Sequence, residues 1–215
     1  MSHQHKMGRL IVIFSLIGIG TVLWSGGGDG EKLKQARKLL YDRAYEQALG
    51  IFEEVLKGDP NELEAALGKM DALAGLRKLE EINRYADTQV KDKAGSAEGF
   101  IISANNAIWR RQFDQAEAQL KQAVEKKTDA YLAHYLLGFV KKITRRPEEA
   151  ITHLNAAIAA NPDFAESYYL LGDLYFAKGE SEKVFQNWRA YLEKVPRGGS
   201  RYEYVSKTLQ SLGSQ

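Results

Sequence analysis

A small or β-branched apolar residue recurs in this chain every 34 positions. The series consists of Ala48, Ile82, Ala116, Ala150 and Val184. Prolines follow the same step at Pro60, Pro162 and Pro196, with Ala94 and Thr128 at the positions between them. A fixed period of this length is typical of stacked helix-turn-helix units, each of which buries its apolar face only against its neighbours. The period therefore predicts an all-α solenoid.

The composition agrees with a helical array and excludes several kinds of site. Hydrophobic residues make up 44% of the 215 residues, and there are four prolines, which suits long helices. The absence of cysteine excludes disulfides, thiol nucleophiles and thiolate-ligated metals. The net charge of +2 comes from Lys6 and Arg9, so the rest of the chain is neutral. Because nucleic-acid binding needs a basic face, we expect no nucleic-acid partner.

An uncharged apolar run occupies residues 10–25 and ends near Trp24, a typical interfacial residue. As a helix this run would span roughly 24 Å, close to the thickness of a thin bilayer core. We expect it to be a transmembrane signal-anchor, with residues 1–9 as a cytoplasmic n-region. Residues 26–30 are rich in glycine and are expected to form a linker.

Two alternatives for this N-terminal segment stay open. It could be a cleaved signal peptide, although the sequence around Ser25 is a poor small-x-small cleavage site. Its orientation is also open, because Lys6 and Arg9 place the N-terminus in the cytoplasm, whereas the lysines that follow the run, such as Lys32, favour the opposite. We prefer the extracytoplasmic side for the body of the chain.

Residues 131–162 and 165–196 carry the clearest repeats. Each contains a Leu-Gly pair, then a small or β-branched residue twelve positions after the glycine, and then a large apolar residue. In order, these are Leu137, Gly138, Ala150 and Leu154 in one unit, and Leu171, Gly172, Val184 and Trp188 in the other. The glycine allows two helices to touch. This pattern resembles the tetratricopeptide repeat, whose consensus contains Leu-Gly, Tyr, Ala, Phe, Ala and Pro at these places.

The resemblance covers roughly residues 29–196. Units beginning near residues 29 and 97 match it in part, whereas the unit near residue 63 has Met70 where a small residue is expected and is placed by register. The resemblance implies an all-α, TPR-like α-solenoid of about five helix-turn-helix repeats over residues 31–196, preceded by one N-terminal transmembrane helix. Residues 197–215 are expected to form a C-terminal capping helix. Its predicted apolar face consists of Tyr204, Val205, Thr208, Leu209 and Leu212.

In this family the first helix of each unit lines a concave face that binds partners. Carried over to this sequence, the partner-binding positions are Arg37, Leu67, Asp71, Ile101, Asn105, Tyr135, Phe139, Lys142, Tyr169, Asp173 and Phe176. The four aromatic residues of this set are either anchors for a peptide or helix, or packing residues between repeats. Both interpretations stay open. The set lacks the run of Lys and Asn with which some members hold a C-terminal carboxylate.

No catalytic constellation is apparent. The body has two histidines, His134 and His153, and lacks a Ser-His-acid set, a phosphate-binding glycine loop and an HExxH sequence. His3 and His5 belong to a polar tail. We therefore expect no enzyme activity, no metal and no cofactor.

The resemblance implies a protein-protein interaction scaffold that is anchored in a membrane and recruits partners through its concave face. A cysteine-free repeat body behind a signal-anchor resembles bacterial envelope assembly factors of this family. The expected location is the bacterial inner membrane, single-pass, with the repeats on the periplasmic side. The expected partners are other proteins (a peptide, a helix or a complex subunit) and the membrane through residues 10–25. The alternatives are a permanent structural subunit of a large membrane complex, and self-association end to end.

Overall fold

The computed structural model describes residues 28–126 and 130–213, and these ranges contain eleven α-helices and no strand. The helices are α1 (Gly28–Tyr41), α2 (Tyr45–Gly58), α3 (Leu63–Gly75), α4 (Leu79–Asp92), α5 (Ala97–Trp109), α6 (Phe113–Lys126), α7 (Tyr131–Ile143), α8 (Pro147–Ala160), α9 (Ala165–Lys178), α10 (Ser181–Lys194) and α11 (Ser200–Gly213). The expected signal-anchor at residues 10–25 and the n-region lie outside the described residues. Among the helices that are described, none is both long and apolar enough to cross a bilayer.

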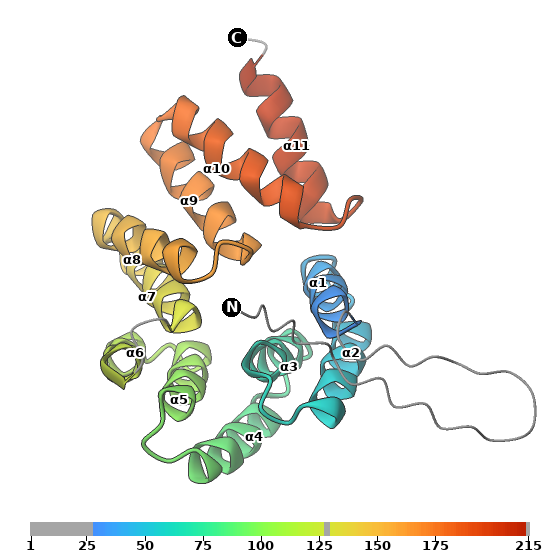
Figure 1. Cartoon of the computed structure of the whole chain (residues 1–215), viewed down its shortest axis with the longest axis vertical. Coiled ribbons are helices and arrows are strands. Elements are labelled where there is room, and N and C mark those ends of the chain that lie inside the picture. Colours follow the sequence, from blue (N-terminus) through green and yellow to red (C-terminus); the bar gives the residue numbers. More distant parts are fainter. Residues whose placement is uncertain (1–27, 127–129, 214–215) are drawn as a thin grey trace, which may run out of the picture.

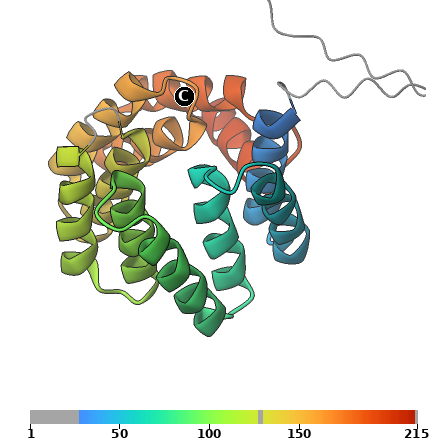
Figure 2. The ribbon, with the colours of Figure 1, turned by 60° about the horizontal axis from the view of Figure 1, so that its bottom comes forward.

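Ten of these helices form five successive pairs, and α11 follows the last pair (Figure 1). The predicted all-α solenoid with a C-terminal capping helix is therefore confirmed. The pairs curve around a common centre, as the turned view also shows (Figure 2). The two ends of the array meet, because α1 contacts α11. The solenoid is thus a closed ring, a feature that the sequence had not indicated.

The series that marks the period is buried throughout. Ala48, Ile82, Ala116, Ala150 and Val184 are each at most 1% exposed, and each lies on the second helix of its pair. Close packing leaves no space for a larger side chain at such a position. The period in the sequence is therefore a period in the core.

The turn within each pair repeats with the same step. Arg43, Arg77, Arg111 and Arg145 have φ angles of 59° to 61°, and Gly179 takes the equivalent position with φ of 73°. In each turn two backbone N–H groups donate to carbonyls of the preceding helix in the pattern of a Schellman cap, such as Ala44 N to Leu39 O and Arg43 N to Leu40 O. Glycine is the usual residue there because L-residues rarely adopt positive φ.

The two clearest units are held together at their glycines. A Cβ atom at Gly138 would overlap Leu154, and one at Gly172 would overlap the Trp188 ring. These glycines therefore allow the close approach of α7 to α8 and of α9 to α10 that the sequence predicted.

The weakest unit in the sequence is also the least regular in space. Met70 is fully buried at a position where the other units have a small residue. Ala86 is buried at a position where the other units have a large one. The helix α3 packs more extensively on α2 than on its own partner α4, and α4 packs more extensively on α5. Gly68 allows α3 to approach α2 closely, because a Cβ atom at this position would overlap the Phe52 ring.

Both ends of the repeat array differ in detail from the expected boundaries. The first helix begins at Gly28, so residues 28–30 of the expected linker form its first turn, where Asp29 complements the positive end of the helix dipole. The last helix, α11, covers α10 with the buried side chains of Val205 and Leu209. Tyr204 from the predicted apolar face is half exposed and meets Trp188 edge-on.

We predict that Gly172→Ala destabilises the protein by about 1–3 kcal/mol, because its methyl group must displace Trp188. The matched control is Gly50→Ala in α2, where the added methyl group meets nothing within 4 Å. That change is expected to stabilise the fold by roughly 0.5–1 kcal/mol through helix propensity. Urea unfolding followed by circular dichroism measures both. Equal effects of the two substitutions would contradict the close approach of α9 and α10.

Candidate partner-binding site at the centre of the ring

A cavity of about 540 Å³ opens on the inner side of the ring. Its walls come from α1, α2, α3, α5, α6, α7 and α11, together with the turn before α6. Most of the lining is apolar or aromatic. The aromatic side chains are Tyr41, Tyr45, Trp109, Phe113, Tyr135 and Phe139.

Four of the predicted partner-binding residues line this cavity: Asp71, Asn105, Tyr135 and Phe139. The Asp71 carboxylate accepts a hydrogen bond from Trp109 Nε1 at 3.1 Å, and burial raises the pKa of Asp71 to about 6. Tyr135 also packs edge-on against Phe164, with the ring centroids 5.0 Å apart. Tyr135 and Phe139 therefore pack between repeats and also line the cavity, and their role as anchors for a partner stays a prediction.

Other predicted positions lie elsewhere. Leu67 and Ile101 are 7% and 2% exposed and belong to the core, because α3 and α5 pack directly on one another along these faces. In the described structure both side chains are therefore part of the core and lie outside the lining of the cavity. Lys142 and Asp173 form an ion pair with each other at 2.6 Å. Phe176 is exposed outside the cavity and stacks on Trp188.

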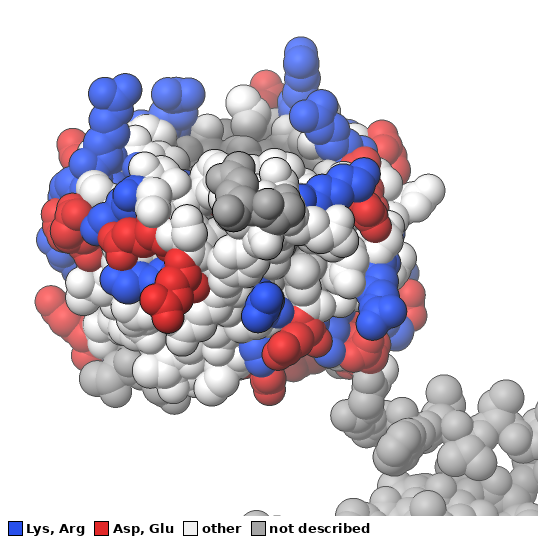
Figure 3. All heavy atoms as spheres, turned by 90° about the horizontal axis from the view of Figure 1, so that it is seen from above, with Lys and Arg blue, Asp and Glu red and all other residues white. Residues whose placement is uncertain are grey.

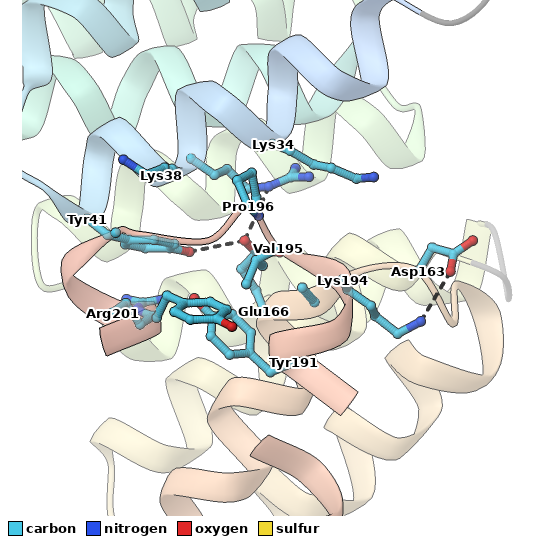
Figure 4. Close-up of a pocket in the computed structure, with 14 residues that line it drawn as sticks. Lys34, Lys38, Tyr41, Asp163, Glu166, Tyr191, Lys194, Val195, Pro196 and Arg201 are labelled. Carbon is cyan, nitrogen blue, oxygen red and sulfur yellow. Dashed lines mark hydrogen bonds and ion pairs between the residues drawn. The ribbon is translucent and has the colours of Figure 1, made fainter. Parts of the chain in front are cut away.

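The junction where the ring closes, between α1 and the segment from α9 to α11, is here called the seam (Figure 4). The backbone N–H of Ser200 donates to Asp42 Oδ1 at 2.7 Å, and the Ser200 hydroxyl donates to the carbonyl of Tyr41 at 3.0 Å. The Tyr41 hydroxyl donates to Glu166 Oε1 at 3.2 Å. These contacts join residues at opposite ends of the array.

A cluster of buried charges lies behind these hydrogen bonds. The predicted residue Arg37 is paired with Glu64 of α3, and its Nε lies 3.2 Å from Glu166 Oε1 of α9. The Tyr131 hydroxyl of α7 donates to Glu64 as well. Burial alone would lower the pKa of Arg37, but Glu166 and Glu64 raise it above its usual range. The charge of Arg37 is thus paired at the closure of the ring, and its role as a partner contact stays a prediction.

Arg201, at the start of α11, faces both the seam and the cavity. Its guanidinium carbon lies 3.2 Å from the centre of the Tyr41 ring and 4.1 Å from that of the predicted residue Tyr169. No carboxylate of the described residues forms an ion pair or hydrogen bond with Arg201, in contrast to Arg37. The sequence pattern did not single out Arg201, because it lies outside the repeats and the same helix carries other charged residues, Glu203 and Lys207.

Charged side chains elsewhere on the surface are mixed in sign. On the face seen from above, acidic and basic groups lie side by side (Figure 3). In the described part of the chain, no group of three or more His, Cys, Asp or Glu residues could hold a metal. His134 and His153 bring their Nδ1 atoms to 3.3 Å of one another, and burial lowers the pKa of both.

The fold and the cavity define a helical-repeat protein with a preformed concave site. Comparison with family models gives the kind of repeat: residues 146–179 match a model described as TPR repeat, and residues 165–195 match one described as tetratricopeptide repeat. Residues 146–195 therefore match tetratricopeptide repeats, in agreement with the resemblance seen in the sequence of this part of the chain.

Solved structures share this fold. A thermophilic TPR protein of Thermus thermophilus superposes with a TM-score of 0.60 at 20% identity, over 87% of this chain and 100% of that one. PilW, a type IV pilus biogenesis factor, superposes with a TM-score of 0.57 at 18% identity, over 88% of each chain. At these identities the likeness concerns the fold alone.

Two curated proteins match parts of the chain. Protein O-mannosyl-transferase Tmtc3 of Drosophila melanogaster is 33% identical over 85 residues, which is 38% of this chain and 9% of that protein. Tetratricopeptide repeat protein 37 of Xenopus laevis is 26% identical over 136 residues, which is 60% of this chain and 9% of that protein. The chain thus spans 9% of the length of each of these relatives.

We predict that Arg37→Met destabilises the protein by about 3 kcal/mol, because it leaves Glu166 buried without its counter-ion. The double variant with Glu166→Gln is expected to recover part of this loss. The control is Lys32→Met, which removes an exposed ion pair with Glu54 and is expected to change stability by at most about 1 kcal/mol. Denaturant unfolding measures all three. If Arg37→Met and Lys32→Met have equal effects, the seam is not held by this cluster.

Proposed function

We propose that this protein is a membrane-anchored interaction scaffold that holds a segment of another protein in its central cavity. The cavity of about 540 Å³, with aromatic walls contributed by several units, is the observation that carries the proposal. Aromatic side chains such as Trp109 and Phe139 supply large contact areas at a small entropic cost. A preformed site also lowers the ordering cost of binding.

The anchoring part of the proposal rests on the sequence. Residues 10–25 are apolar and uncharged, and their length suits a thin bilayer. With Lys6 and Arg9 on the cytoplasmic side, the ring would lie on the outer side of a bacterial inner membrane. A role in assembling envelope complexes fits that location. The similar fold of PilW, a type IV pilus biogenesis factor, supports this proposal.

We predict that Phe139→Ala removes specific partners from a detergent pull-down of the full chain, read by mass spectrometry. Phe139 lines the cavity, so its truncation deletes an apolar anchor. The matched control is Phe176→Ala, whose ring is exposed outside the cavity. The control is expected to keep the partner list unchanged. If both variants keep the same partners, and a chain lacking residues 1–27 loses them, the protein is a permanent subunit held by its N-terminal segment.

We predict that the full chain stays in the membrane pellet after alkaline carbonate extraction, whereas a chain lacking residues 1–27 is released. The physical reason is the cost of exposing an apolar run of this length to water. N-terminal sequencing of the pelleted protein is the control for cleavage. A mature N-terminus after residue 25, or full release of the intact chain, would overturn the anchoring proposal.

A further inference from the structure

Arg201, which lines the cavity, differs from Arg37 and Lys142 in having no ion pair among the described residues. Arg37 has two carboxylate partners, and Lys142 has Asp173. Arg201 is enclosed by Tyr41 and Tyr169 and has no carboxylate partner among the described residues. Aromatic rings stabilise a guanidinium through its faces, and they leave its N–H groups, which point outward in the plane, without acceptors.

The charges that line the cavity give it a positive balance. Arg111 and Arg201 are two cations without an ion pair in the described ranges, and Arg111 lies over the Phe113 ring. Asp71 is the one acidic side chain of this lining, and its carboxylate is already engaged by Trp109. A ligand that fits these walls has apolar groups and at least one negative charge.

We propose that Arg201 is the anchor of a carboxylate-binding subsite in the central cavity, so that the partner segment is acidic and apolar. This inference rests on the proposed function, since it names the chemistry of the segment that the same cavity holds. A carboxylate accepts two parallel hydrogen bonds from a guanidinium, which is the strongest pairing open to Arg201. The carboxylate belongs either to an Asp or Glu side chain or to a C-terminus.

Two features of the site favour a ligand over a purely structural role for Arg201. The seam already has its own polar contacts in the Ser200–Asp42 hydrogen bond and the Arg37–Glu166 ion pair. The walls around the subsite are also mostly apolar, and a low local dielectric strengthens a charge-assisted hydrogen bond. Arg201 therefore contacts Tyr41 and Tyr169 at the seam and also lines the cavity, where a carboxylate can reach it.

The experiment selects peptides from a random dodecapeptide library on the immobilised full chain in detergent, for the original sequence and for Arg201→Gln. We expect the peptides captured by the original sequence to be rich in Asp or Glu together with aliphatic and aromatic residues. A captured acidic peptide is then compared with its Gln-substituted form by fluorescence anisotropy. Arg201→Gln is expected to weaken binding of the acidic peptide about tenfold or more. Binding of the Gln-substituted peptide is expected to change little.

Peptides with free and amidated C-termini separate the two sources of the carboxylate. Arg201→Lys is expected to restore part of the affinity, since it keeps the charge and loses the bidentate geometry. Asp42→Ala loosens the same seam without touching Arg201, and it is expected to keep the acidic preference.

Three outcomes would count against the subsite. Captured peptides without acidic enrichment, or an equal loss of both peptide forms in Arg201→Gln, would overturn the assignment of Arg201 while leaving the cavity as a binding site. Loss of the acidic preference in Asp42→Ala would give Arg201 a structural role only. Peptide capture that Phe139→Ala leaves unchanged would instead overturn the proposed function of the cavity itself.

Discussion

Closure of the ring depends on one buried cluster of charges. Arg37 of α1 lies between Glu64 of α3 and Glu166 of α9, so a single guanidinium joins the first, second and fifth units. Apolar faces can pack in several registers, whereas a buried charge tolerates only the position in which its partner is present. The cluster therefore defines where the two ends of the array meet. The meeting brings α1 and α11, which carry Tyr41 and Arg201, to the same cavity as α5 and α7.

The sequence could predict the local fold because the contacts of a solenoid are mostly between neighbours. Residues such as Ala116 and Gly172 face the same environment in each unit, so their period is visible in the chain. Closure is different, because Tyr41 and Glu166 are 125 residues apart and no repeated pattern encodes their meeting. For this reason the repeat pattern reaches Asp71 and Phe139, which line the cavity, but it does not distinguish the buried Leu67 from them and does not reach Arg201.

The irregular second unit bears on the curvature of the whole array. Small rotations between units accumulate along a solenoid, so one unit with a different pairing changes where the last unit arrives. In this unit the large side chain of Met70 and the small one of Ala86 reverse the sizes found at the equivalent positions of the other units. The helix α3 also packs more extensively on α2 than on α4. The same helix also carries Glu64, which places the irregular unit in direct contact with the closing cluster. A weak match to the repeat is thus tied to the feature that makes this ring unlike an open superhelix.

The geometry of Arg201 makes closure and binding compatible. Tyr41 and Tyr169 use the faces of the guanidinium, while a carboxylate in the cavity would use its edge, so a ligand does not have to displace the contacts that hold α11. A ligand that binds the closed ring and not the open array stabilises closure by mass action. A bound partner segment would then stabilise the contacts at the seam, and those contacts in turn hold the walls of the cavity in place.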